Sequence, residues 1–179
     1  NKDIVQILVD QGADVNLKTI FGWTLLNRAT RAGLKEICRL LLERGVDVDA
    51  KDNWGRTAMQ LAIEERHEDI VQILVDQGAN VNLKTEEGKT PLHFAARQGV
   101  ENVCWLLLER RAYVNAKDKY GFSALAEAIE GRHTGIVKIL VDQGAYVNLE
   151  LGRGKTLLHF ATRGRLERIC WLLIKGGAN

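Results

Sequence analysis

A period of about 33 residues runs through the whole chain and constrains its fold more than any other feature. A short segment that begins with Thr or Ser recurs at this spacing: Thr24-Leu25-Leu26-Asn27, Thr57-Ala58-Met59-Gln60, Thr90-Pro91-Leu92-His93, Ser123-Ala124-Leu125-Ala126 and Thr156-Leu157-Leu158-His159. A period of this length is typical of solenoids, whose units bury their apolar faces only against each other. We therefore expect a single stacked array over 1–179, with a partial unit at 1–15 and repeats at about 16–48, 49–81, 82–114, 115–147 and 148–179.

Composition excludes several classes of protein. Hydrophobic residues make up 46% of the chain and charged residues 27%, as in an ordinary folded protein. The net charge of +2 is too small to predict binding to nucleic acid or to a membrane surface. No apolar run approaches the roughly 18 residues that a membrane-spanning helix needs. We expect a soluble protein without membrane insertion, in the cytoplasm or, as the alternative, in the nucleus.

The three cysteines, Cys38, Cys104 and Cys170, are spaced by two repeat lengths, so they share one position in alternate repeats. Helices in a stack lie about 8–10 Å apart, so these positions should be separated by roughly 16–20 Å. A disulfide needs Cα atoms within about 7 Å, and the ligands of Zn²⁺ converge more closely still. The cysteines are therefore expected to pack in the core, and no metal or other cofactor is predicted.

Residues 82–114 show what one unit should form. The polar stretch 82–89 ends near a turn glycine and predicts an exposed hairpin-like connection. Thr90 can cap a short helix in which Pro91 takes the first position, and Gly99 permits a sharp reversal. A second helix is expected from Glu101 to Glu109, with one apolar face formed by Val103, Cys104, Leu107 and Leu108.

These motifs resemble those of ankyrin repeats. The resemblance rests on Thr90-Pro91-Leu92-His93, on Ala95-Ala96 with Gly99, and on Gly78-Ala79-Asn80-Val81-Asn82, and it covers essentially the whole chain. It implies an all-α solenoid of stacked helix-turn-helix units with β-hairpin fingers. It also implies that the fingers and the inner helices line a concave groove.

Some residues depart from this pattern. Arg66, Arg132 and Arg165 stand where Gly33 and Gly99 connect the two helices of other repeats. Arg111 likewise replaces the glycine of the turn after the second helix. If these arginines adopt a left-handed backbone, each costs about 1 kcal/mol.

No motif in the chain predicts catalysis. The sequence lacks a phosphate-binding glycine loop, a nucleophile elbow and metal-ligand spacing. The resemblance implies that His93 and His159 hydrogen-bond near the helix starts, while His67 and His133 lie at the helix connections. The carboxylates Glu64, Glu65 and Glu130 are expected on solvated helix faces. We therefore predict that the protein is not an enzyme.

Aromatic residues and arginines predict a binding surface. Large rings flank the finger glycines and follow the helix starts, at positions that the ankyrin frame turns towards the groove. Tyr, Trp and Arg are the residues that dominate binding hot spots. The predicted partner-binding set is Phe21, Trp23, Arg28, Arg31, Trp54, Arg56, Phe94, Arg97, Tyr120, Phe122, Phe160 and Arg163. The alternative is that these rings pack on one another or on the adjacent finger.

A second surface is predicted at Trp105 and Trp171, which share an outer-helix position on the convex side. Either these rings form a contact surface, or they lie flat over neighbouring helices. Both ends of the chain fall within a repeat, so we expect a piece of a longer array. Self-association through the end faces or through the convex face is an alternative to binding another protein.

The expected function is a scaffold that binds a partner protein through the groove. Inner-helix charges alternate in sign between repeats, from Arg28 and Arg31 to Glu64 and Glu65 and then Arg97, which interrupts any basic track for nucleic acid. No nucleic-acid partner is therefore expected. The alternatives are a sensor or regulatory array of a larger channel, signalling or defence protein, and a homotypic assembly module.

The sequence also follows a longer period, in which a pair of repeats is the unit. Residues 3–19 and 69–85 are identical except at Asp14 and Asn80. Residues 135–148 repeat the sequence of residues 69–82 with three substitutions. The repeats differ from one another mainly at the finger and inner-helix positions, where Glu86-Glu87 replaces Ile20-Phe21. This contrast within one chain predicts that the groove carries the function.

Overall fold

The structure, a computed structural model, describes residues 6–7, 10–151 and 154–179. Much of the expected partial unit at 1–15 lies outside the described residues. The helices form successive antiparallel pairs: α2 (Leu25–Arg31) and α3 (Lys35–Glu43), α4 (Ala58–Glu64) and α5 (Glu68–Asp76), α6 (Pro91–Gln98) and α7 (Glu101–Glu109), α8 (Ala124–Glu130) and α9 (Thr134–Asp142), α10 (Leu157–Arg163) and α11 (Glu167–Lys175).

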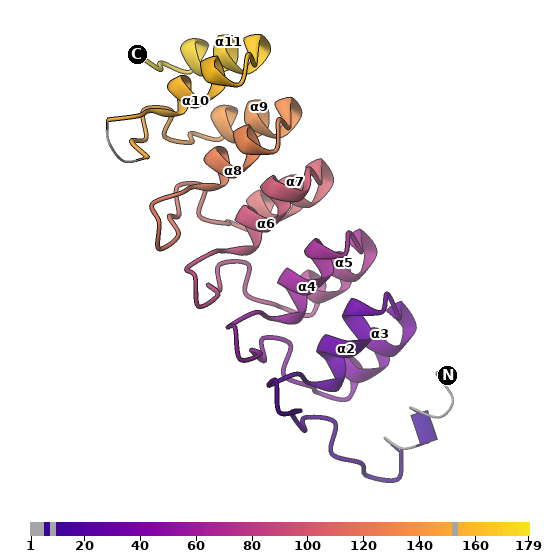
Figure 1. Cartoon of the computed structure of the whole chain (residues 1–179). Helices are drawn as coiled ribbons and strands as arrows, with labels where there is room; N and C mark the ends of the chain where they lie inside the picture. Colours follow the sequence, from indigo (N-terminus) through magenta and orange to yellow (C-terminus); the bar gives the residue numbers. More distant parts are fainter. Residues whose placement is uncertain (1–5, 8–9, 152–153) are drawn as a thin grey trace.

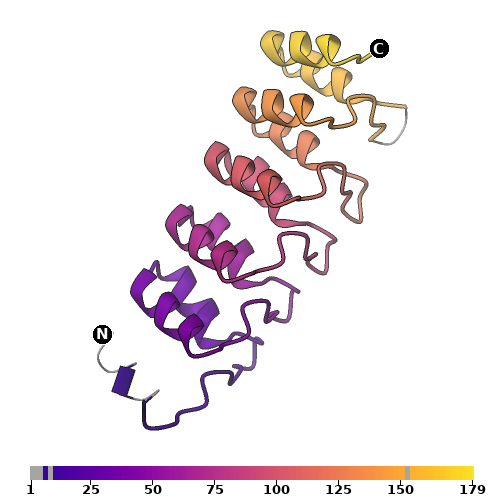
Figure 2. The ribbon, with the colours of Figure 1, turned by 180° about the vertical axis from the view of Figure 1, so that it is seen from behind.

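The helix pairs stack into an elongated solenoid, and extended fingers project from one side of it (Figure 1). Helices α2, α4, α6, α8 and α10 form an inner layer in which each packs on the next. Helices α3, α5, α7, α9 and α11 form the outer layer, as the reverse view also shows (Figure 2). The predicted all-α solenoid of stacked helix-turn-helix units is confirmed.

Each inner helix starts at a side-chain cap. At α2, the backbone N–H of Asn27 donates to Thr24 Oγ1 (3.2 Å), and the N–H of Thr24 donates to Asn27 Oδ1 (2.9 Å). The same reciprocal capping box opens α4, α6 and α10, so the predicted capping role of Thr90 is confirmed. Because each box satisfies two N–H groups that the helix leaves free, the recurring Thr or Ser fixes where the inner layer begins.

The fingers are hairpins closed by one repeated backbone bond. The N–H of Thr85 donates to the carbonyl of Lys89 (3.0 Å), and equivalent bonds close the fingers at Thr19, Asp52, Asp118 and Leu151. Neighbouring fingers are also joined, because the N–H of Glu86 donates to the carbonyl of Trp54 (2.9 Å). Among the described residues, ladder pairing is limited to isolated bridges such as Lys117 with Ser123. The fingers therefore hold a fixed spacing without forming a sheet.

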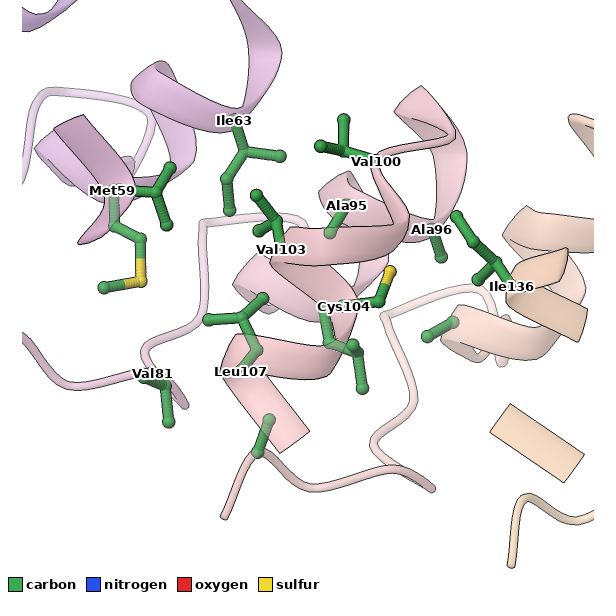
Figure 3. Packing of buried hydrophobic residues seen from close by; sticks show 14 of the residues in the cluster. Met59, Ile63, Val81, Ala95, Ala96, Val100, Val103, Cys104, Leu107 and Ile136 are labelled. Carbon is green, nitrogen blue, oxygen red and sulfur yellow. The ribbon is translucent and has the colours of Figure 1, made fainter. Parts of the chain in front are cut away.

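A continuous apolar core runs between the two layers (Figure 3). Val103, Cys104 and Leu107 of α7 are buried as predicted, whereas Leu108 is half-buried at the edge of the stripe. Cys38 is buried too, and Cys170 is half-buried against the core. Burial raises the pKa of the Cys104 thiol to about 12, so this cysteine stays protonated and packs as a small apolar residue.

All four arginines that replace glycine adopt a left-handed backbone. Their φ angles are 59° at Arg66, 65° at Arg111, 59° at Arg132 and 53° at Arg165. The predicted strain of about 1 kcal/mol at each position therefore applies. At Arg66 the side chain offsets part of this strain, because the Arg66 guanidinium donates a hydrogen bond to the carbonyl of Gln98 in the next repeat.

A contact between glycine and histidine links two kinds of repeat that follow each other in the sequence. A Cβ atom added to Gly99 would lie 2.5 Å from the His133 ring, and one added to Gly33 would lie 2.8 Å from the His67 ring. His133 Nε2 also lies 3.0 Å from the carbonyl oxygen of Arg97. We call each of these two contacts a Gly–His junction. A repeat with glycine at this turn is thus followed by a repeat with histidine.

Candidate functional site

The predicted binding residues lie on the fingers and the inner helices, and they differ in how far they reach into solvent. Trp23, Arg56, Phe94 and Phe122 are half-buried. The exposed members of the predicted set are Phe21, Arg28, Arg31, Trp54, Tyr120, Arg97, Phe160 and Arg163. The prediction that large rings project from the fingers thus holds best at Phe21, Trp54 and Tyr120.

Two of these rings form a stacked pair across adjacent fingers. The ring centroids of Phe21 and Trp54 lie 6.3 Å apart with planes inclined by 18°. Both rings remain about half exposed, at 55% and 50%. The N–H of Asn53 donates to the Phe21 carbonyl (3.1 Å) and holds the two fingers in register. We call Phe21 and Trp54 the aromatic finger pair.

Arginines lie over two of the tryptophan faces. The guanidinium of Arg56 lies 5.2 Å from the Trp54 ring centroid, and that of Arg31 lies 5.1 Å from the Trp23 ring. The indole N–H of Trp23 is buried, so this ring is less available to a partner than Trp54 is. Trp54 therefore has a preset orientation, fixed by a stacking partner and a cation.

Buried aspartates hold the finger tips in place. Asp52 accepts hydrogen bonds from the N–H groups of Trp54 and Arg56 and from Arg56 Nε, each at 2.9 Å. Two fingers later, Asp118 accepts the backbone N–H groups of Tyr120 (2.9 Å) and Phe122 (2.8 Å). The sequence reasoning missed this role, although an Asp two residues before an exposed aromatic residue of the finger is a signal that could have revealed it.

A cavity of about 500 Å³ lies beside the aromatic finger pair, and we call it the central cavity. It brings together four residues of the predicted set: Trp54, Arg56, Phe94 and Arg97. Other charged and polar side chains in its wall were not in that set, namely Glu64, Thr85, Glu86, Glu87, Lys89, His93, Gln98 and Glu127.

Acidic groups of the central cavity are partly buried. The expectation that Glu64 lies on a solvated face is wrong, because its side chain is only 29% exposed and pairs with Arg56 Nη1 at 3.3 Å. Burial raises the pKa of the Glu64 carboxyl, and Arg56 opposes that shift. Glu65 and Glu130 are exposed as expected. The repeat pattern of the sequence alone therefore did not predict that Glu64 is partly buried and ion-paired in the wall of the central cavity.

The alternating charges of the inner helices form ion pairs between successive repeats. Arg31 Nε lies 3.3 Å from Glu65 Oε1, and Arg97 Nη1 lies 3.7 Å from Glu127 Oε2. The sequence indicated only that these charges alternate in sign between repeats. The structure shows that the opposite charges meet across the repeat boundary.

The aromatic residues nearer the C-terminus do not join the aromatic finger pair. Phe122 and Phe160 line a second, more apolar cavity of about 250 Å³. Tyr120, Arg28 and Arg163 line neither this cavity nor the central one. The predicted set is thus divided between separate parts of the groove.

The predicted convex surface is exposed at both tryptophans. Trp105 is 43% and Trp171 58% exposed, so both rings reach solvent. Lys175 Nζ lies 5.1 Å from the Trp171 ring centroid, and Trp171 borders a cavity of about 650 Å³ between α9 and α11. Trp105 does not line that cavity.

Two exposed tyrosines were missed by the sequence reasoning. Tyr113 and Tyr146 follow the turns after α7 and α9, at the positions that Asp47 and Asn80 occupy in other repeats. Their backbone N–H groups donate to Asn82 Oδ1 and Asn115 Oδ1, both at 2.8 Å. An aromatic residue in place of a polar one was the available signal.

Histidines of the chain serve the fold. His93 is buried, its Nδ1 accepts the N–H of Thr90 (3.2 Å), and its Nε2 therefore donates to the carbonyl of Phe122 (3.1 Å). Within the described residues, no three His, Cys, Asp or Glu side chains are grouped closely enough to hold a metal ion. None of the helices in that part of the chain is long and apolar enough to cross a membrane.

Comparison with known proteins agrees with the repeat architecture. Residues 1–85 and 78–151 match the family model described as ankyrin repeats (3 copies). A search of curated proteins found no match. Ankyrin repeats are in general modules for protein–protein interaction. The family match over most of the sequence, together with the stacked helix pairs and their fingers, shows that this chain belongs to the ankyrin repeat family.

Proposed function

We propose that this ankyrin array binds a partner protein through its concave face, centred on the aromatic finger pair and the central cavity. The observation that carries the proposal is the pair itself. Phe21 and Trp54 stay half exposed although they stack on each other, and Arg56 holds the Trp54 ring beside a cavity of about 500 Å³. Rigid aromatic rings beside a cavity are typical of binding hot spots.

Rigidity favours binding at this place. Two hydrogen bonds from backbone N–H groups to Asp52 and the bond between fingers at Phe21 fix the tip before any partner arrives. A surface that is ordered in advance loses less conformational entropy on association. The Phe122 and Phe160 cavity extends the same face and offers a second apolar contact.

Replacing Trp54 with alanine tests the proposal. We expect proteins captured by the wild-type array to be lost from Trp54→Ala and from Phe21→Ala, because each change removes half of the stacked pair. Tyr113→Ala is the matched control, since it removes an exposed ring outside the groove cavities. Circular dichroism should show unchanged helicity in all three variants. Equal capture by Trp54→Ala and the wild type would contradict the proposal.

Self-association through the convex face is a second candidate, favoured by the exposure of Trp105 and Trp171. If this face joins two copies of the chain, light scattering should show a mass that rises with concentration. The rise should disappear when both tryptophans are replaced with alanine. A constant monomer mass would leave the concave face as the binding surface.

A further inference from the structure

One acceptor in the central cavity lacks a donor in the part of the chain that the structure describes. Glu127 of α8 is 3% exposed, and its Oε1 lies 3.1 Å from Lys89 Nζ. Its Oε2 accepts no hydrogen bond from the described residues. Arg97 Nη1, at 3.7 Å, lies beyond hydrogen-bonding distance of that oxygen. A buried carboxylate oxygen without a donor is costly, so a group that donates there gains free energy.

Charge around this oxygen favours a cation over an anion. Four glutamates line the central cavity against three basic residues. Of the basic residues, Arg56 is already paired with Asp52 and Glu64, and Lys89 with Glu127 and Glu87. An incoming anion would meet the buried Glu127 carboxylate, whereas an incoming cation would complete its charge pairing.

The cavity also offers apolar walls that suit a basic side chain. Phe94 and Trp54 both line it, and aromatic faces attract Lys and Arg cations. The same chemistry already operates in this groove, where Arg56 lies over Trp54. The methylene groups of a long basic side chain can lie along such rings while its charged end reaches a carboxylate.

The Arg97 side chain lies over Glu127 Oε2 and can be displaced from it. Its side chain is 59% exposed, and its only ion pair in the described part of the chain is the 3.7 Å contact with Glu127. The 3.7 Å contact is longer than a hydrogen bond and the Arg97 side chain is mostly in solvent, so displacing Arg97 costs less than breaking the 3.1 Å pair of Lys89 with Glu127 would. Its departure would leave Glu127 Oε2 open to another donor.

We infer that the central cavity binds a basic side chain, Lys or Arg, of the partner protein, with Glu127 as the recognising carboxylate and Arg97 as its exchangeable cover. This inference rests on the proposed function, because it names the chemistry that the groove selects. The partner segment that enters the groove should therefore present a basic residue beside the aromatic finger pair.

Small amides of single amino acids test the inference without a known partner. Acetyl-arginine amide and acetyl-lysine amide are titrated into the ¹⁵N-labelled array, with acetyl-citrulline amide as the neutral control. We expect weak, saturable shifts of the Trp54 indole N–H and of amides near Phe94 and Arg97 with the basic probes only. Equal shifts with citrulline, or stronger shifts with acetyl-glutamate amide, would overturn the inference.

Two variants assign the effect to the named residues. Glu127→Gln should abolish the saturable shifts, because it removes the charge while keeping the shape. Arg97→Ala should tighten binding of the basic probes about two- to five-fold, since the cation that competes for Glu127 Oε2 is removed. Arg39→Ala is the control, because Arg39 is an exposed arginine of the outer helix α3, outside the central cavity and outside the predicted binding set.

Arg97→Ala keeps the inference testable even if Glu127→Gln fails to fold, because Arg97 is exposed and its loss leaves the Lys89–Glu127 pair in place. Weaker binding of the basic probes to Arg97→Ala would overturn the inference. The two proposals also fail separately. Loss of the probe effect alone leaves capture through Trp54 intact, whereas unchanged capture by Trp54→Ala contradicts the proposed function itself.

Discussion

His93 joins two repeats through the two nitrogens of a single ring. Its Nδ1 accepts from Thr90 at the start of its own helix, and its Nε2 donates to the Phe122 carbonyl on the next finger. The bond from Thr90 to Nδ1 requires the neutral ring, whereas Nε2 can donate in either protonation state. Burial lowers the pKa of His93, although the Phe122 carbonyl, Glu127 and Asp118 act in the opposite direction.

Stability should therefore fall when the solution is acidified below the ordinary histidine pKa of 6.5. Below that value the unfolded chain takes up a proton at His93 that the folded chain does not, so unfolding is favoured by at most about 1.4 kcal/mol per pH unit. His93→Gln should reduce this dependence, and urea unfolding between pH 7.5 and 5.5 would measure it. Gln60 already makes the equivalent bond with Thr57, and its Nε2 donates to the Leu83 carbonyl of the next repeat. An unchanged pH dependence in His93→Gln would assign the effect to other groups.

The sequence predicted the exposed rings better than it predicted what surrounds them. Trp54 and Tyr120 could be placed on finger tips because the repeat register gives each residue a position in its unit. The stacking on Phe21 could not be predicted, since it depends on the spacing between two fingers. The sequence also did not predict that Glu127 Oε2 is buried and accepts no hydrogen bond from the described residues. Burial of this charged inner-helix residue depends on Lys89 and Arg97, which belong to the preceding repeat.

At the scale of elements, the turn between the inner and the outer helix decides how successive pairs fit together. Gly99 ends α6 with φ at 76°, and the His133 ring of the next repeat occupies the space where a Cβ would lie. The sequence identified the reversal at Gly99 and the arginines that replace glycine elsewhere. It did not reveal that His133 requires the missing Cβ, because this contact links residues of different repeats.

Gly99→Ala should destabilise the array more than Gly144→Ala does. Both glycines have a left-handed backbone, with φ at 76° and 80°, so each substitution carries about 1 kcal/mol of backbone strain. A Cβ at Gly144 meets nothing within 4 Å, whereas one at Gly99 meets the His133 ring. We expect a further loss of about 1–3 kcal/mol at Gly99 from overpacking, measured by urea denaturation.

A second substitution identifies the cause of the extra loss. His133→Ala should recover part of the stability of Gly99→Ala, because it removes the ring that the new Cβ meets. If Gly99→Ala and Gly144→Ala lose the same stability, backbone strain alone accounts for both.

At the scale of the whole molecule, stability comes from contacts between neighbours in the stack. Inner helices pack on inner helices, fingers bond to fingers, and ion pairs such as Lys35 with Asp69 and Arg110 with Asp76 join adjacent repeats. The stability of such an array is approximately a sum of the terms for each unit and each interface. Its interfaces can therefore be tested by removing whole units.

Deleting residues 82–114 should destabilise the chain more than deleting residues 49–81, although each deletion removes one complete repeat. The first deletion places His133 against the repeat that contains Arg66, whose Cβ occupies the space that Gly99 leaves free. The second places Val100 against Gly33, which leaves room and causes no clash. Thermal unfolding followed by circular dichroism would compare the two. A higher midpoint for the variant that lacks 82–114 would contradict the role of the Gly–His junction.

Because of the Gly–His junctions, removing an even number of repeats has a different effect from removing an odd number. Removing an even number of units, such as residues 49–114, brings Gly33 against His133, and this junction matches the one that Gly33 makes with His67 in the intact chain. Removing an odd number of internal units leaves one mismatched junction, at which either a histidine meets an arginine turn or the space beside a glycine turn stays unfilled by histidine. Recombination between such repeats should therefore preserve function most readily when it shifts the chain by a pair of repeats. The groove would then lengthen or shorten by two fingers at a time and keep its spacing for a partner.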